Sequence, residues 1–194
     1  YYSVTILQTA GFTDLSAQLL GTVASGVVNV VMTVPGMYFI DRVGRRPLLL
    51  SGDAVMGSAL TILAVLVAVY QPDFNNAAIP WVCLVMMCIF VAGFAYSWGP
   101  IGWVIPSEIY PLRIRAKAVS LTTASNWLFN IIVGLLSPLI MKLIGWGFYL
   151  ILVGFLAIMC TWVFFFVPET KGKSLEEIDV LFGQTGATSA LEAK

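Results

Sequence analysis

Uncharged polar and aromatic side chains that could bind a ligand lie deep within long apolar stretches of this sequence. Asn29 and Asn126 are amides, and Trp103 and Trp127 are indoles, each within or beside an uncharged run. An amide donates and accepts hydrogen bonds, and an indole offers a flat ring and one N–H donor. Because none of the four carries a charge, they predict a binding site for a neutral, hydrogen-bonding molecule.

Each of these residues also has a purely structural interpretation. Trp103 follows a Gly-Pro break and could be an interfacial belt tryptophan. Asn126 and Asn130 repeat at helical spacing and could make an amide contact between helices. The glycines of a stripe on one helix face could simply allow close helix packing, although Asn29 at mid-membrane depth favours a polar cavity. The stripe consists of Thr22, Gly26, Asn29, Thr33 and Gly36.

Charged residues gather at the ends of the apolar stretches. Acidic residues in three such places have arginine or lysine close by, which suits ion pairs that tie helix ends together; solvated charges that only fix the topology are the alternative. The predicted network consists of Asp41, Arg42, Arg45, Arg46, Glu108, Arg115 and Glu169.

Asp53 is the one acidic residue that interrupts a predicted membrane span. Ionisable residues within spans are costly to bury and are functional by default, so a proton relay is one hypothesis. A second is that Asp53 reaches the interface or a cation, because the nearest arginines lie about two helical turns away.

Long helices must position these residues. Hydrophobic residues make up 59% of the chain and charged residues 10%, and the mean hydropathy is +0.93. About 20 apolar residues span a bilayer as a helix, so we expect an all-α membrane protein. The predicted spans are 17–40, 47–70, 80–106, 116–141 and 146–167, preceded by the remnant of a sixth helix at 1–10.

The positive charges predict the orientation. Lys and Arg concentrate near 41–46, near 107–117 and after the last span, whereas the alternate loops contain Lys142 alone. Loops rich in Lys and Arg stay in the cytoplasm. We therefore expect these loops and the C-terminus to be cytoplasmic.

Several other classes of protein are disfavoured. A net charge of zero without a long basic run argues against a nucleic-acid partner. The sequence has no histidine, and its three cysteines lie in apolar runs, so neither a zinc site nor a disulfide framework is indicated and no cofactor is expected. No nucleophile, base and polar pocket combine in a catalytic arrangement, so we do not expect an enzyme.

Three charged motifs at helix ends resemble the cytoplasmic signatures of a known family. The resemblance is to sugar porters of the major facilitator superfamily, most of all to fungal hexose transporters, and it extends from Tyr1 to about Phe182. The motifs are Asp41-Arg42-Val43-Gly44-Arg45-Arg46, then Pro106-Ser107-Glu108 with Arg113 and Arg115, and then Pro168-Glu169-Thr170-Lys171-Gly172.

The resemblance implies the C-terminal six-helix half of such a bundle, with its first helix truncated. Residues 1–170 would then be the transmembrane half, from the end of helix 7 to helix 12, and 171–194 a partly disordered cytoplasmic tail. An N-terminal six-helix half would be missing. One departure is Gly102, where many members of the family have a second proline.

The resemblance also assigns roles to individual residues. Tyr1 and Tyr2 match a tyrosine pair near the outer gate, and the charged network matches an inner latch. The remaining matches line or support the sugar site; they are Asn29, Trp103, Asn126 and Trp127.

The expected function is transport of a neutral hexose or polyol across the plasma membrane by alternating access, either facilitative or coupled to protons. A sugar sensor that does not transport is the first alternative. A truncated gene product without activity of its own is the second, because the chain starts as though within a helix.

Overall fold

The regular secondary structure of the described residues is entirely helical. The computed structural model describes residues 15–70, 78–110 and 113–172. The predicted helix remnant at 1–10 lies outside these residues. The helices are α2 (Leu15–Val43), α3 (Arg45–Tyr70), α4 (Ala78–Tyr96), α5 (Trp98–Ile109), α6 (Arg115–Ile144) and α7 (Gly147–Phe166).

Five segments of the described chain are long and apolar enough to cross a membrane, which confirms the predicted number of complete spans. Four of them correspond to α2, α3, α6 and α7, and the fifth, Ala78–Ile109, comprises α4 and α5 together. A helix satisfies its own backbone hydrogen bonds, which lipid cannot do. The chain is therefore a multi-pass helical membrane protein.

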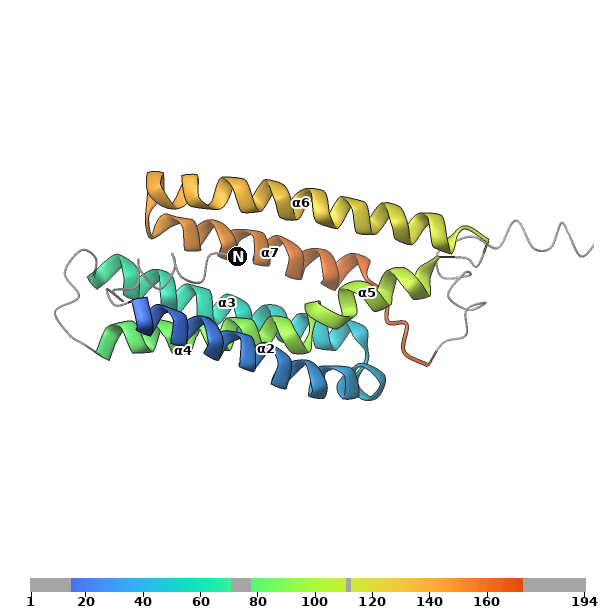
Figure 1. Ribbon diagram of the computed structural model, residues 1–194. Helices are drawn as coiled ribbons and strands as arrows, with labels where there is room; N and C mark the ends of the chain where they lie inside the picture. The colour runs from blue at the N-terminus through green and yellow to red at the C-terminus, as the bar shows by residue number, and fades with distance from the viewer. Residues whose placement is uncertain (1–14, 71–77, 111–112, 173–194) are drawn as a thin grey trace, which may run out of the picture.

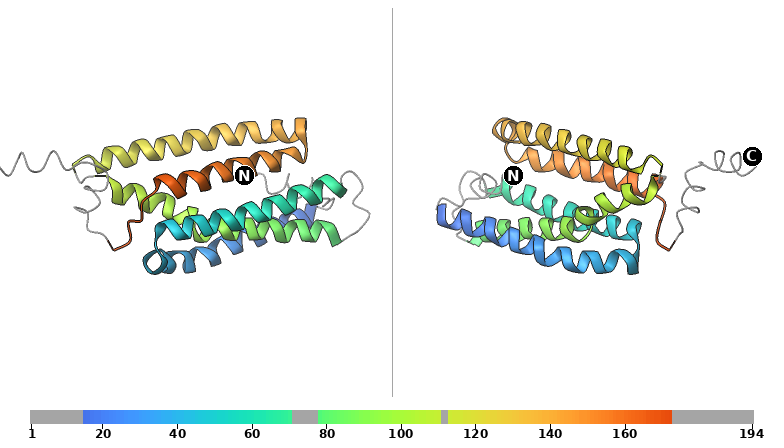
Figure 2. Two further views of the ribbon diagram at one scale, coloured as in Figure 1. Left: turned by 180° about the vertical axis from the view of Figure 1, so that it is seen from behind. Right: turned by 45° about the vertical axis from the view of Figure 1, so that its right-hand side comes forward.

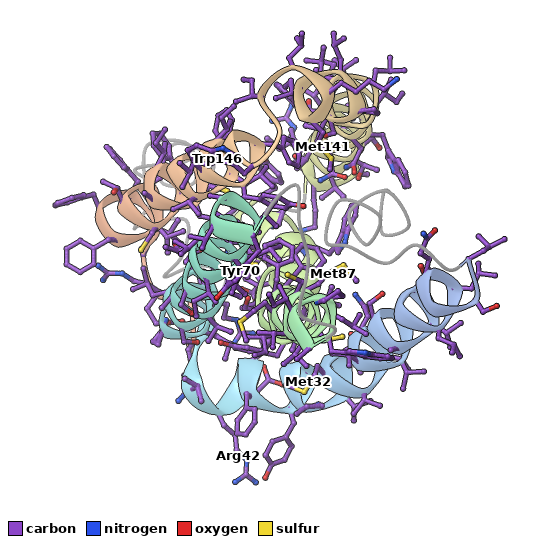
Figure 3. The ribbon with its side chains drawn as sticks, turned by 90° about the vertical axis from the view of Figure 1, so that its left-hand side faces the viewer. Met32, Arg42, Tyr70, Met87, Met141 and Trp146 are labelled. Carbon is purple, nitrogen blue, oxygen red and sulfur yellow. The ribbon has the colours of Figure 1, made fainter. Side chains whose placement is uncertain are left out.

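The helices form two groups that α3 joins. In Figure 1, α6 and α7 lie side by side above α2, α3 and α4, and the view from behind in Figure 2 shows the same division. The most extensive contacts are those of α3 with α4 and α7, and of α2 with α4. Viewed from the end, α3 and α4 lie between α2 and the pair α6 and α7 (Figure 3).

Apolar side chains fill two clusters along α3. The first surrounds the later part of α3, where Leu63 and Val67 meet Tyr149 of α7, which is 2% exposed. The second surrounds its start, where Leu49 meets Ile101 of α5 and Val163 of α7. Both clusters draw on α3, so this helix forms the centre of the described fold.

α5 leaves the line of α4 and slants towards the start of α6 (Figure 1). The predicted single helix at 80–106 is therefore two helices, separated at Ser97. The sequence predicts an interruption at Gly99 and Pro100, two and three residues further on. Proline lacks an N–H donor, so Pro100 leaves the carbonyl of Tyr96 without its helical partner and weakens the helix on its N-terminal side.

The two glycines of the α2 stripe have different surroundings. A Cβ atom at Gly36 would lie 2.7 Å from the Cα atom of Tyr96 and 2.9 Å from its carbonyl oxygen, whereas a Cβ atom at Gly26 would meet nothing within 4 Å. Close helix packing therefore explains Gly36, which lies against the end of α4, but not Gly26.

We expect Gly36→Ala to destabilise the protein by about 1–3 kcal/mol, because the methyl group would overlap backbone atoms that cannot move cheaply. Gly26→Ala on the same helix is the matched control, and it should be neutral or slightly stabilising because alanine favours helix. Thermal unfolding of the two purified variants measures the difference. Equal melting temperatures would contradict the close contact between α2 and α4.

Candidate functional site

A tight turn between α2 and α3 starts the most connected polar group in the described structure. Gly44 has a φ of 108°, a conformation that side chains disfavour, and its N–H donates to the carbonyl of Ile40 at 3.2 Å. A Cβ atom here would lie 2.6 Å from Oε2 of Glu169. The glycine therefore permits both the turn and the approach of a carboxylate from the segment after α7.

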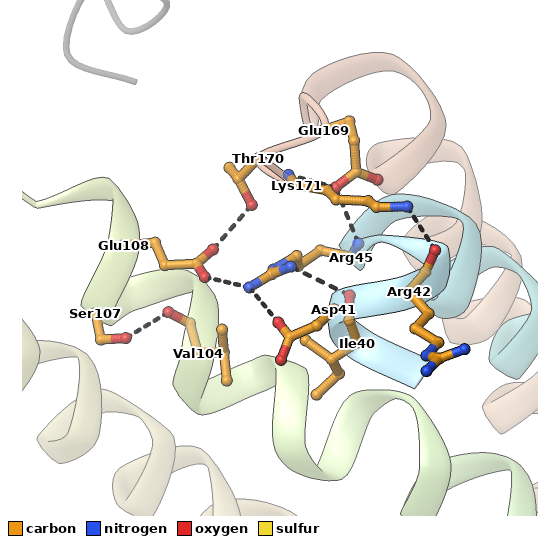
Figure 4. A network of polar contacts seen from close by, with 10 residues as sticks. All are labelled: Ile40, Asp41, Arg42, Arg45, Val104, Ser107, Glu108, Glu169, Thr170 and Lys171. Atoms are coloured by element: carbon orange, nitrogen blue, oxygen red, sulfur yellow. Dashed lines mark hydrogen bonds and ion pairs between the residues drawn. The ribbon is translucent and has the colours of Figure 1, made fainter. Parts of the chain in front are cut away.

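Arg45, the first residue of α3, extends its side chain between two other helix ends (Figure 4). Its Nη2 atom lies 2.7 Å from Oε1 of Glu108 on α5 and 3.2 Å from Oδ1 of Asp41 on α2. The side chains of Arg45 and Glu108 are 12% and 22% exposed, whereas that of Asp41 is 80% exposed. The pair with Glu108 is the less hydrated one, so it contributes more to holding the helix ends together.

Glu169 binds the same turn through the backbone. Its Oε1 accepts from the N–H of Arg45 at 3.0 Å, and its Oε2 accepts from the N–H of Arg46 at 3.0 Å. These are N–H groups at the start of α3 that have no partner within the helix. Glu169 therefore caps α3, and among the described residues it makes none of the ion pairs with arginine or lysine side chains that the sequence predicts.

The capping bonds also govern the ionisation of Glu169. Burial favours the neutral form, but backbone N–H groups of Lys171, Arg45, Arg46 and Thr170 outweigh it and lower the pKa of the carboxyl below its ordinary value of 4.5. Glu169 is therefore a carboxylate at neutral pH.

Thr170, for which the sequence predicts no role, completes the group. Its hydroxyl donates to Oε2 of Glu108 at 2.8 Å, and the residue is 5% exposed. The only sequence signal for Thr170 was its place in the third charged motif. Glu108 is thus bound through one oxygen to α3 and through the other to the segment after α7, and we call Asp41, Arg45, Glu108, Glu169 and Thr170 the end network.

The other three arginines of the predicted network bind elsewhere. Arg42 lies over the ring of Tyr38 at 4.5 Å, and Arg46 lies over the ring of Phe164 at 5.2 Å. The Nε atom of Arg115 donates to a main-chain carbonyl at 3.0 Å, that of Tyr110. Arg46 adjoins the end network through its N–H, which donates to Glu169. Arg42 adjoins it through Lys171, which donates from its side chain to the carbonyl of Arg42 and from its N–H to Glu169, whereas Arg115 lies outside the network.

The predicted ligand-binding residues lie on three different helices. Asn29 is half-buried on α2, Trp103 is 49% exposed on α5, and Trp127 is 54% exposed on α6 beside the exposed Asn126. α5 packs against both α2 and α6. Within the described residues no hydrogen bond or ring contact joins these side chains, and Tyr1 and Tyr2 lie outside that part of the chain.

The two amides of α6 bind each other. Asn130 donates from Nδ2 to Oδ1 of Asn126 at 3.0 Å and to its main-chain oxygen at 2.9 Å. The bond lies within one helix, so Asn130 does not use this donor to contact another helix. The bond occupies Oδ1 of Asn126 and restrains the Asn126 amide. The NH₂ group of Asn126 makes no hydrogen bond with the described residues.

Apolar spans, an interrupted helix and a polar group at one end of the bundle define a polytopic helical membrane protein. No cluster of three or more His, Cys, Asp or Glu side chains in the described ranges could hold a metal ion. The chain belongs to the sugar (and other) transporter family, whose model matches residues 1–182. This confirms the family resemblance of the three charged motifs.

Individual relatives agree with this membership. The chain is 38% identical to sugar transport protein 1 of Arabidopsis thaliana over 92% of this chain, and 36% identical to the H(+)/hexose cotransporter 2 of Parachlorella kessleri over 94%. It is also 34% identical to the high glucose sensor RGT2 of Saccharomyces cerevisiae over 94%. These alignments cover 35%, 34% and 24% of the respective relatives, so the chain spans about a third of their length or less.

Solved structures of XylE, the xylose transporter from E. coli, share the fold. A double tryptophan mutant superposes with a TM-score of 0.81 at 34% identity, covering 93% of this chain and 38% of that one. The proton:xylose symporter XylE bound to 6-bromo-6-deoxy-D-glucose gives a TM-score of 0.75 at 33% identity, with the same coverage.

The burial of the end network predicts which acidic residue matters more for stability. Glu108→Ala should cost about 2 kcal/mol, because it removes the acceptor of the buried Thr170 hydroxyl and leaves Arg45 with the hydrated Asp41 as its remaining ion-pair partner among the described residues. Asp41→Ala is the matched control and should cost about 0.5 kcal/mol or less, because its carboxylate is hydrated. Thermal unfolding measures both, and an equal loss would mean that Glu108 does not hold the helix ends together.

The lowered pKa of Glu169 predicts that the stability of the folded protein depends on pH. Its pKa is lower in the folded protein than its ordinary 4.5, so its contribution is fully present at neutral pH and is lost as the pH falls through the folded pKa. Glu169→Gln should therefore be less stable than the native protein at pH 7, by about 1 kcal/mol, and the gap should narrow below about pH 4.5. Denaturant unfolding across this range is the measurement; a constant gap would contradict the capping role.

Proposed function

We propose that this chain forms the C-terminal part of a carrier that moves a neutral monosaccharide across a membrane by alternating access. A preceding half of six helices would supply the rest of the transport path. The observation that carries the proposal is the end network, in which α2, α3, α5 and the segment after α7 meet at one end of the helical bundle. The chain belongs to a family of sugar (and other) transporters. Such a network can hold one end of a carrier closed.

Opening that end requires the network to separate. α5 would have to leave α3, which breaks the contact of Arg45 with Glu108, and the segment after α7 would lose the bond of Thr170. Each contact is short and partly buried, so the closed state is favoured until binding energy elsewhere offsets the loss. We therefore assign the end network as an inner latch, with Arg42 and Arg46 at its edge.

The distribution of charge supports a cytoplasmic position for this latch. Arginines and lysines at the turn between α2 and α3, at the start of α6 and after α7 all flank the same ends of the spans. By the positive-inside rule, we propose that these ends of the spans, and the C-terminus, are cytoplasmic. Among the membranes available, we propose the plasma membrane, where a sugar carrier meets external substrate.

The amides and indoles on α2, α5 and α6 are the proposed sugar-binding residues. Asn29 and Asn126 would bind hydroxyl groups, and Trp103, with Trp127 in support, would stack on the apolar face of the ring. No charged side chain belongs to this set, which fits a neutral substrate. We propose protons as the coupling ion because two of the relatives are named as proton cotransporters of sugars.

A sugar sensor is the second candidate, because one relative is named a high glucose sensor. A sensor would bind sugar through the same residues but would not accumulate it. Net uptake therefore distinguishes the two functions, whereas binding alone does not.

The full-length protein, expressed in cells that lack sugar uptake, should take up a labelled hexose or pentose. Asn126→Ala should raise the KM at least about tenfold, because a buried hydrogen bond to a hydroxyl is lost. Ser120→Ala is the control on the same helix, since its exposed hydroxyl donates, among the described residues, to the carbonyl of Ala116 alone. Binding without uptake by the native protein would favour the sensor, and an unchanged KM in Asn126→Ala would contradict the site.

A further inference from the structure

The joint between α4 and α5, residues Tyr96, Ser97 and Trp98, packs against α3 through three residue pairs with the same sequence separation. At Ser97 the backbone leaves helical geometry, with φ of −117° and ψ of −87°. Three consecutive residues of α3 meet the three consecutive residues of the joint, each paired with the residue 45 positions further along the chain. The pairs are Ser51 with Tyr96, Gly52 with Ser97, and Asp53 with Trp98.

The first two pairs bring the helices into close contact. The hydroxyl of Tyr96 lies 3.3 Å from that of Ser51. A Cβ atom at Gly52 would lie 1.9 Å from the hydroxyl oxygen of Ser97, which is completely buried and donates to the carbonyl of Gly93 at 2.6 Å. No side chain fits between α3 and the joint at this point, so the joint cannot slide along α3 without separating from it.

The third pair is polar and lies within the span. Oδ1 of Asp53 accepts from Nε1 of Trp98 at 2.6 Å, and the residue is 3% exposed. Oδ2 is also buried and has no hydrogen-bond partner among the described groups. Among the described residues Asp53 makes no ion pair, so no arginine or lysine side chain of that part of the chain neutralises it. Burying a carboxyl group within a membrane span costs free energy. The hydrogen bond from Trp98 is the interaction that offsets part of this cost.

Trp98 is the first residue of α5, and α5 carries both parts of the proposed transport machinery. The helix is 12 residues long, with Trp103 in its middle and Glu108 near its end. α5 is continuous through Pro106, which lies between the other two side chains. Its orientation at Trp98 therefore sets the position of Trp103 directly and that of Glu108 through the rest of the helix. The bond of Asp53 thus acts at the pivot of the segment that links the sugar-binding residues to the end network.

We propose that Asp53 is a positioning residue for transport: its bond to Trp98 fixes the orientation of α5 and so couples the sugar site to the inner latch. The inference rests on the proposed carrier function. It deepens that function by adding a residue that touches neither the substrate nor the latch. The bond requires an acceptor at position 53, not a charge.

Substitutions at the two positions separate the bond from the charge. Asp53→Asn retains an acceptor oxygen for Trp98, whereas Asp53→Ala removes it and Trp98→Phe removes the donor. Asp53→Ala and Trp98→Phe should each lower the maximal uptake rate per folded transporter about tenfold, with KM changed less than about threefold. Asp53→Asn should stay within about threefold of the native rate, and the double variant should be no worse than either single change. Ser58→Ala is the control on α3, because its exposed hydroxyl bonds only the carbonyl of Val55.

A second measurement does not depend on transport. With the other cysteines replaced, a cysteine introduced at the exposed Ser107 of α5 reports the orientation of that helix through its rate of reaction with a maleimide in purified protein. Asp53→Ala should change this rate at least about threefold and Asp53→Asn should not, since only the former frees α5 at its pivot.

The outcomes distinguish the inference from the carrier function. If the native protein takes up no sugar but Asp53→Ala still alters maleimide labelling, the carrier function fails and the positioning of α5 by Asp53 stands. The positioning role is overturned if Asp53→Asn is as defective as Asp53→Ala. It is also overturned if Asp53→Ala leaves both the uptake rate and the labelling rate unchanged.

Discussion

The contacts of Arg45 are the constraint on which the described arrangement of helix ends depends. Its N–H binds Glu169 while its guanidinium binds Glu108, so one residue joins α3 to α5 and to the segment after α7. This is possible because Gly44 turns the chain in a conformation that leaves room for a carboxylate. α3 also supplies residues to both apolar clusters, so the polar contacts at its start and the apolar contacts along its length fix the same neighbours.

The positions of the spans could be predicted closely because lipid leaves few alternatives. The described helices extend the predicted segments by one to three residues at most ends, since apolar runs and the Gly-Trp-Gly turn near 146 mark the boundaries well. At Gly145 the φ of 60° and the bond from its N–H to Met141 show why α6 ends there. The interruption at Ser97 was harder to place, because a proline acts on the turn that precedes it and the packing of α3 selects the residue at which the helix breaks.

The polar contacts were less predictable than the spans, for a physical reason. Opposite charges at neighbouring helix ends suggest ion pairs, and Arg45 with Glu108 follows that pattern. Among the described groups, Glu169 instead binds unpaired N–H groups at a helix start, which compete with side-chain cations and are already ordered. The bond between Asp53 and Trp98 joins residues 45 positions apart with no local signal in either stretch, so only the packing of α3 on the joint brings them together.

The proposed sugar-binding amides lie on the least buried helices, which indicates that another part of the protein covers them. Only 17% of the residues in the most apolar stretch of α2 and 11% of those in that of α6 are buried, yet Asn29 and Asn126 lie on these helices. An amide exposed to acyl chains loses its hydrogen bonds with water, so such positions are favourable only beside protein or a hydrated cavity. α5 already contacts both helices and carries Trp103. The proposed preceding half would then cover the open faces of α2 and α6. Binding of one sugar by residues from both halves would supply the free energy that shifts α5 between its two orientations.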